Sequence, residues 1–328
     1  MVSPNLSIAI IGAGPAGCLL ARLLLKCSIS QVVIFEADPS PDSRRQGGSL
    51  DLHRKTGIAA LKQAGLYKEF LRHARFDGEA FCLCDKHLTS DTINSRAERA
   101  TLLLDRLPSD MIRWGYRLLS VSEGNILHFS QGVEKGLDLV VGADGVWSQV
   151  RRFLTPEQPL FCGIIGQVYT IPDADTTAPS VAALVNRGSL YAYSNGKGLT
   201  GQQHGNGSIQ VTAWTRTSQD DGVHVSLDGQ CVKRRIINSF SARHIYTLPI
   251  GFQWRRCSGV TLVGDAAHPM PPFAGEGVNL AFEDAMRLAD AVSKLIKYPN
   301  LTLEKVLQAY ENQAFQRAHR AQDLSIGV

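Results

Sequence analysis

Glycines at a fixed spacing stand near the start of the chain, where Gly12, Gly14 and Gly17 form the pattern G-x-G-x-x-G. A β-branched apolar run precedes them, and apolar residues at helical spacing follow. In such a strand–loop–helix unit the first glycine permits a tight turn, the second lets the backbone approach a pyrophosphate, and the third lets the helix pack against the strand. The N–H groups and the positive dipole end of the helix then face the phosphates. The sequence therefore predicts a dinucleotide site.

A carboxylate follows at the spacing that this site needs. A second apolar run, QVVIFEAD, contains Glu36 at its end, 24 positions after Gly12. Such a carboxylate can accept hydrogen bonds from ribose hydroxyls, and it repels the extra 2′-phosphate of NADP. FAD or NAD is therefore expected at this site. The motif alone leaves these two cofactors open, and also a Gly-rich turn that binds nothing.

Two later segments also combine glycines with polar groups beside an apolar strand. Residues 137–154, LDLVVGADGVWSQVRRFL, predict a buried strand, a turn and a helix, in which Asp144 can cap the helix and Arg151 can meet a phosphate or that carboxylate. Residues 264–285, GDAAHPMPPFAGEGVNLAFEDA, place Asp265, paired prolines and glycines before a helical run. Either segment alone could be an ordinary turn, but glycines of this kind predict something held close to the backbone.

In this order the segments resemble the fingerprints of the single-component FAD-dependent aromatic hydroxylases, the group A flavoprotein monooxygenases. The matching residues are GAGPAG, then GADG followed by Ser148 and Arg151, then GDAAH with PPFAGEGVN. Within that family, GGSLDLH and MPPFAGEGVNLA look most like the tetracycline-inactivating monooxygenases and their fungal relatives. The resemblance covers most of the chain. It implies an α/β fold with a Rossmann-like FAD-binding domain, a mixed or antiparallel sheet substrate domain and a C-terminal helix.

The resemblance also implies how FAD is held. Asp265 would accept a hydrogen bond from the ribityl chain, and the backbone N–H groups of 275–279 would pass the pyrimidine edge of the flavin, with the positive end of the following helix aimed at N1. Pro271 and Pro272 would stiffen the turn toward the reacting face of the ring. The cofactor-binding residues expected from the motifs and the resemblance are Gly12, Gly14, Ala16, Gly17, Glu36, Arg44, Gly48, Asp51, Arg99, Asp144, Asp265, Pro272, Gly275, Gly277, Val278 and Asn279.

The chemistry implied by the resemblance is that of the cofactor, so no catalytic triad and no metal are expected, only Pro272 and Gly275 near the flavin. NADH or NADPH would reduce the flavin, O₂ would give a flavin C4a-hydroperoxide, and one oxygen would pass to an aromatic or polyketide-like substrate. The choice of nicotinamide stays open. His268 could serve as an acid or base, but a histidine satisfied by the backbone is the favoured interpretation.

The middle of the chain is expected to form the substrate side. The stretches SLYAYS, SIQVTAW and RHIYTLP alternate as strands do. The expected domains are a discontinuous FAD-binding domain at 1–154 and 257–296, a substrate-binding sheet domain at 155–256 and a C-terminal helix at 297–328 that only packs. The substrate-lining candidates are Tyr193, Gln203, His204 and Trp214, with Tyr191 beside them. For each of them, a core or surface position in the sheet is the alternative.

Composition excludes other classes of protein. The chain has 328 residues, a formal net charge of +4 and no block of basic residues interleaved with aromatics, so nucleic acid is not an expected partner. No stretch approaches the roughly 18 apolar residues of a membrane span, and no signal peptide is recognised. The seven cysteines lack the paired spacing of a zinc site. A cytoplasmic monomer is expected.

The chain departs from the family pattern in three places. Ala37 stands where the family carries an arginine, and relative to the family pattern stretches are shortened ahead of SRAERATLLLDRLP and between GQCVKRRIINSF and HIYTLP. The alternative function is therefore an FAD-binding protein with lost or weak catalysis, a shortened isoform or a sequestering protein. A NAD-dependent dehydrogenase would rest on the first motif alone, and the GDAAH segment argues against it.

Overall fold

A five-stranded parallel sheet forms the centre of the first half of the molecule. The structure, a computed structural model, describes residues 6–43, 51–74, 80–84, 90–94, 98–99, 107–108, 110–217 and 241–326. The strand order of this sheet is β17-β11-β1-β2-β7, and every pair in it is parallel. The strands are β1 (Ile8–Ile11), β2 (Val32–Glu36), β7 (Ile112–Trp114), β11 (Leu139–Gly142) and β17 (Val260–Leu262).

The parallel sheet is covered on both faces, which explains why its strands are continuous apolar runs. Ile8, Ile10 and Ile34 face a core shared with the helices, whereas Ala9 and Phe35 face a second core on the other side. The helices of the first core are α1 (Pro15–Lys26), α2 (Gly57–Ala64), α3 (Tyr67–His73), α8 (Gly277–Lys297) and α9 (Leu303–Ile326). The second core adds α4 (Gln149–Leu154) and the antiparallel strands β8 (Leu118–Ser122), β9 (Ile126–Phe129) and β10 (Gly132–Glu134).

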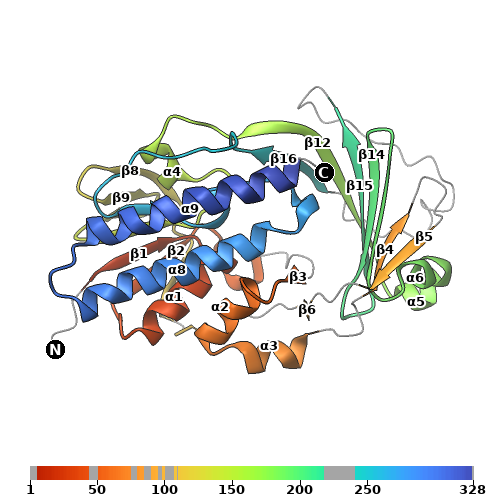
Figure 1. Cartoon of the computed structure of the whole chain (residues 1–328), viewed down its shortest axis with the longest axis horizontal. Helices are drawn as coiled ribbons and strands as arrows, with labels where there is room; N and C mark the ends of the chain where they lie inside the picture. The colour runs from red at the N-terminus through yellow and green to blue at the C-terminus, as the bar shows by residue number, and fades with distance from the viewer. Residues whose placement is uncertain are drawn as a thin grey trace.

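A seven-stranded mixed sheet forms the second half (Figure 1). Its order is β16-β12-β15-β14-β13-β4-β5, antiparallel except for the parallel pair of β13 and β4. The strands are β4 (Ala80–Cys84), β5 (Ser90–Asn94), β12 (Leu160–Ile171), β13 (Ser189–Ser194), β14 (Lys197–Gln203), β15 (Ile209–Arg216) and β16 (Ser241–Thr247). The helices α5 (Ala174–Thr177) and α6 (Pro179–Val185) pack against one end of it.

The predicted fold class is confirmed, with the Rossmann-like sheet, the mixed sheet and the C-terminal helix all present. One pairing crosses the expected domain boundaries: β4 and β5 lie in the first segment of the chain but extend the seven-stranded sheet. Figure 1 shows α8 and α9 side by side, with the end of α9 reaching the seven-stranded sheet near β16. Within the described ranges, no helix has the length and hydrophobicity needed to cross a bilayer.

Candidate cofactor and substrate site

Four of the predicted segments lie at one edge of the parallel sheet. Gly12 follows β1, Glu36 ends β2, Asp144 lies just beyond β11, and Asp265 lies just beyond β17. Parallel strands end at a common edge, and open α/β sheets bind ligands in the crevice outside their carboxyl ends. The structure therefore brings groups that are up to 253 positions apart in the sequence to one edge of the sheet, where a ligand crevice is expected.

The glycine loop has the tight packing that its spacing predicts. Gly12 has φ +105°, and a Cβ on it would lie 2.4 Å from the carbonyl oxygen of Ala143. A Cβ on Gly17 would lie 2.1 Å from the carbonyl oxygen of Gly12. Helix α1 begins directly after Gly14, and among the described residues no side chain caps its first turn. The loop thus presents the start of a helix to the crevice, an arrangement that suits a pyrophosphate.

Glu36 is held against this loop. Its carboxylate accepts hydrogen bonds from the backbone N–H of Ala13 (2.6 Å) and of Asp38 (3.0 Å), and the residue is buried. Two charge-assisted bonds fix the position of the carboxylate before any ligand arrives. The ribose role predicted for Glu36 is compatible with this position.

The GADG turn is tied to the GDAAH segment by Arg151. The Asp144 carboxylate accepts a hydrogen bond from the N–H of Gln149 (2.7 Å) in the first turn of α4, although the N-cap residue of this helix is Ser148. The buried guanidinium of Arg151 donates to the carbonyl oxygens of Ala266 (2.8 Å) and Val146. Arg151 therefore binds two backbone carbonyls instead of the phosphate or carboxylate considered from the sequence. Desolvation lowers the pKa of Arg151 and raises that of Asp144.

The GDAAH segment presents one carboxylate to the crevice. Asp265 keeps an exposed side chain, yet protein surrounds it closely enough that desolvation raises the pKa of the carboxyl, while the charge of His268 lowers it. An accessible carboxylate inside a recess is suited to a polar ligand. The sequence analysis favoured a backbone partner for His268, but the structure pairs it with a side chain. Its Nε2 lies 2.5 Å from the buried carboxylate of Asp284.

The start of α8 leaves room beside its backbone. A Cβ built on Gly277 would meet no atom within 4 Å, and Gly275 combines φ +66° with equally open space. Asn279 has no exposed surface; its side chain accepts from the N–H of His53 (2.7 Å) and donates to the carbonyl of Asp51 (2.8 Å). The start of α8 is thereby fastened to residues 51–53, and Gly277 stays accessible.

Other cofactor candidates are placed only in part. Arg44 and Gly48 lie outside the described residues. The backbone of Arg99 pairs with that of Asp51 across β3 (Asp51–Leu52) and β6 (Glu98–Arg99). Ala16 is buried in the first turn of α1, Pro272 is exposed, and Val278 is half-buried in the first turn of α8.

These residues fit FAD. Within the described part of the chain, Oδ1 of Asp144 is buried without a hydrogen-bond partner, so this edge holds a polar atom that the protein itself leaves unsatisfied. The open space beside Gly277 lets a ligand approach the backbone there, and the accessible carboxylate of Asp265 offers the ligand a hydrogen-bond acceptor. The glycine loop would hold the phosphates, Glu36 the adenosine ribose, and the segment from Asp265 to Gly277 the flavin half.

An aromatic cavity of about 540 Å³ adjoins the last of these segments. Pro271 and Phe273 line it from the cofactor side, and Tyr193 and Trp214 line it from the seven-stranded sheet. The Phe273 ring meets both rings edge-on, with centroids 6.2 Å from Tyr193 and 5.3 Å from Trp214. Desolvation raises the pKa of Tyr193 to about 12 with a contribution from Tyr191, so the phenol is neutral.

Two glycines in the sheet make room for these rings. A Cβ on Gly166 would lie 2.5 Å from the ring of Trp214, and one on Gly198 would lie 2.6 Å from the ring of Tyr193. Both glycines sit opposite the aromatic residue on a neighbouring strand. An isolated glycine within a strand often marks such a close approach. This signal was available in the sequence and would have strengthened the prediction of Tyr193 and Trp214.

The structure does not bring Gln203 and His204 to this cavity. The cavity opens at the Lys197 end of β14, whereas Gln203 is the last residue of that strand, roughly 20 Å away at about 3.3 Å per residue. Gln203 is buried there and its side-chain amide donates to Asp175 of α5 (3.3 Å). Tyr191 is also absent from the cavity lining. The lining residues missed from the sequence are Cys162, Ile164, Ser194, Asn195, Gly196, Lys197, Gly198, Thr215, Arg216, Thr247, Phe273 and Ser325.

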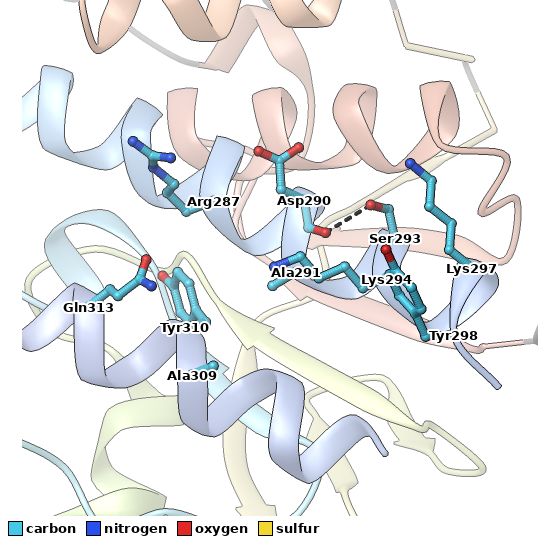
Figure 2. A pocket seen from close by; sticks show the side chains of 10 residues that line it. All are labelled: Arg287, Asp290, Ala291, Ser293, Lys294, Lys297, Tyr298, Ala309, Tyr310 and Gln313. Carbon is cyan, nitrogen blue, oxygen red and sulfur yellow. Dashed lines mark hydrogen bonds between the residues drawn. The ribbon is translucent and has the colours of Figure 1, made fainter. Parts of the chain in front are cut away.

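A second cavity, of about 460 Å³, lies between α8 and α9 away from the carboxyl edge of the sheet (Figure 2). Figure 2 shows Arg287, Asp290 and Lys297 of α8 on one side and Tyr310 of α9 on the other. Arg287 pairs with Glu283, and Asp290 accepts from Gln63 (2.6 Å). No residue predicted for the cofactor or substrate lines it, so we place the functional site at the first cavity.

Comparison with known proteins supports FAD as the cofactor. The FAD binding domain family matches residues 5–104 and 136–325. The monooxygenase asqM of Emericella nidulans is 27% identical over 416 aligned positions, which cover 98% of this chain and 94% of that protein. The 6-hydroxynicotinate 3-monooxygenase of Pseudomonas fluorescens is 25% identical over 99% of this chain and 91% of its own length. The tetracycline destructase Tet(55) shares the fold, with a TM-score of 0.75 and 17% identity over 99% of this chain and 89% of its own.

Proposed function

The chain belongs to the FAD binding domain family, and we propose that this FAD-dependent monooxygenase uses NADH or NADPH and O₂ to hydroxylate an aromatic or polycyclic small molecule. The observation that carries the proposal is the aromatic cavity beside Pro271 and Phe273, in the same segment that supplies Asp265 and Gly277 to the FAD crevice. Bound FAD would supply the redox chemistry with the nicotinamide and O₂. The chain would supply the position of the substrate and a cavity shielded from water.

The cavity walls suit a planar ring. Trp214 and Phe273 offer an aromatic corner, and the neutral phenol of Tyr193 can donate a hydrogen bond to an oxygen of the substrate. The thiol of Cys162 is protonated as well, because desolvation raises its pKa to about 11, so it is no nucleophile. Lys197 and Arg216 are exposed at the rim and favour a substrate with an anionic substituent.

The test is a turnover assay on the purified FAD-loaded protein. Oxidation of NADH and of NADPH is followed with and without each member of a panel of phenols, aromatic acids and polycyclic phenols, and the product is analysed by mass spectrometry after reaction under isotopically labelled O₂. We expect at least one compound to stimulate oxidation and to gain one labelled oxygen atom. Absence of labelled product across the panel would count against the proposed function.

The alternative, a protein that binds FAD without turnover, is favoured by one observation. The alignment with asqM runs over 416 positions although this chain has 328 residues, so that relative contains internal segments that this chain lacks. On this reading the protein would take up FAD but leave reduced nicotinamide untouched with every compound. A single turned-over substrate would remove the alternative.

A further inference from the structure

Two buried side chains, His268 and Asp284, and the half-buried Arg317 connect the predicted FAD crevice to the C-terminal helix. Nε2 of His268 lies 2.5 Å from Oδ2 of Asp284 on α8, and Oδ1 of Asp284 accepts from Arg317 on α9 at 2.9 Å. The side chain of Asp284 has no exposed surface, that of His268 has 2% and that of Arg317 has 13%. The sequence predicts α9 as a helix that only packs, and the structure adds an ion pair from this helix to Asp284 of α8.

The same carboxylate holds the backbone just before the crevice residue. Oδ2 of Asp284 also lies 3.2 Å from the N–H of Gly264. Gly264 has φ +61°, and a Cβ there would lie 3.4 Å from Cβ of Ala16 on α1 and 3.2 Å from Cβ of Ala281 on α8. The turn is thus wedged between two helices and bonded to Asp284 on both sides of Asp265, at Gly264 and at His268.

The charges in this network alternate along its length. Desolvation opposes the charge on both partners, yet the Coulombic attraction and hydrogen bond between them leave the pKa of His268 raised and that of Asp284 lowered, with Arg317 also holding the Asp284 carboxyl low. Asp265 faces His268 as the last member of the series. Buried ion pairs are expensive to desolvate, and well-packed apolar residues often stabilise a fold as much or more. Stability alone is therefore a weak reason for charges at this place.

We propose that Asp284, His268 and Arg317 are positioning residues that set the Asp265 carboxylate for FAD, so that the C-terminal helix contributes to cofactor affinity. The inference rests on the FAD site and is independent of the proposed substrate. Arg317 touches neither the crevice nor the glycine loop among the described contacts, and its direct link toward Asp265 runs through Asp284. Helix α9 also packs on residues 270–274, so the test needs a control that loosens this helix without touching Asp284.

A second buried network on α9 provides a matched control. Glu311 accepts hydrogen bonds from Thr261 (2.9 Å) and Trp254 (3.2 Å) and pairs with Arg256 at 3.5 Å. This network fastens α9 to β17 and to residues 254–256 just before that strand. Within the described structure it contacts no member of the GDAAH segment. Loss of this network should loosen α9 without moving Asp265.

The experiment compares Arg317→Met and Arg317→Lys with Glu311→Gln. For each full-length apoprotein, thermal unfolding gives the stability and titration with FAD, followed by quenching of flavin fluorescence, gives Kd. We expect Arg317→Met to raise the Kd for FAD about tenfold, the size of effect expected for a partly lost charge-assisted hydrogen bond. Arg317→Lys keeps the positive charge and should restore most of the FAD affinity. Glu311→Gln should lower the unfolding temperature and keep Kd within about twofold of wild type.

Two results would overturn the inference. One is an unchanged Kd in Arg317→Met; the other is an equal rise in Kd for Arg317→Met and Glu311→Gln at similar loss of stability, which would assign both networks to folding alone. If Arg317→Met does not fold, His268→Gln takes its place in the comparison with Glu311→Gln. Because Kd is measured without substrate, failure to find a hydroxylated product leaves this outcome unaffected.

Discussion

The parallel sheet and the seven-stranded sheet contribute to the site by different means. At the parallel sheet the contacts expected with FAD come largely from backbone, at Gly12, Gly14 and Gly277, with carboxylates at fixed places beside them. At the seven-stranded sheet the cavity is lined by side chains, among them Tyr193 and Trp214. Strand geometry alone does not dictate which side chains stand at these positions. A backbone site tolerates few residue types, whereas a side-chain site varies freely on one scaffold.

This difference predicts two classes of variant. Changes at the carboxyl edge of the parallel sheet should act on FAD affinity. Changes on the seven-stranded sheet should keep FAD bound and act on the choice and affinity of the substrate.

Gly12→Ala should have the largest effect. The new Cβ would lie 2.4 Å from the carbonyl oxygen of Ala143 at φ +105°, a strain of roughly 3 kcal/mol that the loop can relieve only by leaving the geometry expected to face the pyrophosphate, so FAD affinity should fall at least about 100-fold. The purified protein should lack visible flavin absorbance. Gly132→Ala is the control, because it also has positive φ (+152°) but open space and a place in the β9–β10 hairpin. Retention of FAD by Gly12→Ala would remove the glycine loop from the site.

Gly277→Ala separates cofactor contact from folding. A Cβ there meets no protein atom within 4 Å, and alanine favours a helix over glycine by about 0.5–1 kcal/mol, so the apoprotein should unfold at the same or a higher temperature. If FAD occupies the open space, its affinity should fall about tenfold through overpacking. Unchanged FAD affinity would show that the ring lies elsewhere. Thermal unfolding of the apoprotein and an FAD titration give both values.

These two glycines also show what was predictable from the sequence. The motifs around Gly12, Glu36 and Asp144 were readable because each requires a residue type at a set distance from a strand or helix end, and the resulting strand–turn–helix units are confirmed. The meeting of these units at one edge follows from parallel pairing. Local pattern and general rules of α/β sheets together therefore predict the cofactor half.

The substrate half was predicted only in part, for geometric reasons. Strand alternation assigns a residue to a face of the sheet, but position along the strand decides whether it reaches the cavity, and this separates Tyr193 from Gln203. The pairing of β4 with β13 joins residues more than 100 positions apart and leaves no local signal. The contact between His268 and Asp284 joins residues only 16 positions apart, but it depends on how the turn before α8 folds back on that helix, which no local pattern shows.

Trp214→Ala tests the side-chain half. Loss of one aromatic wall should raise KM for a cyclic substrate roughly tenfold while the Kd for FAD stays unchanged. Gln203→Ala is the matched control from the far end of β14 and should leave KM unchanged even if it lowers stability. Equal effects of the two variants on KM would mean that the cavity at Trp214 is not where the substrate binds.

The charged network predicts a loss of stability at alkaline pH. The folded-state pKa of His268 is raised, so its contribution is complete below its ordinary value of about 6.5 and is lost as the pH rises through the higher folded-state value. Asp284 and Asp265 face His268, and the lowered pKa of Asp284 keeps its own contribution until strongly acidic pH. Thermal unfolding from neutral to alkaline pH should show a decline in the wild type that His268→Gln lacks. Parallel profiles would contradict the assignment.

The smallest effects are expected at the rim of the cavity, where Lys197 and Arg216 are exposed. Exposed charges contribute about 0.2–1 kcal/mol, so Lys197→Met or Arg216→Met should raise KM about two- to fivefold for an aromatic acid and leave a neutral analogue unaffected. High salt should remove the difference between variant and wild type because it screens exposed charges. A change in KM that is equal for both compounds would instead indicate a steric effect. In that case Lys197 and Arg216 would contact the substrate ring itself and would not select for an anionic substituent. The division of the cavity into an aromatic interior and a cationic rim would then be wrong.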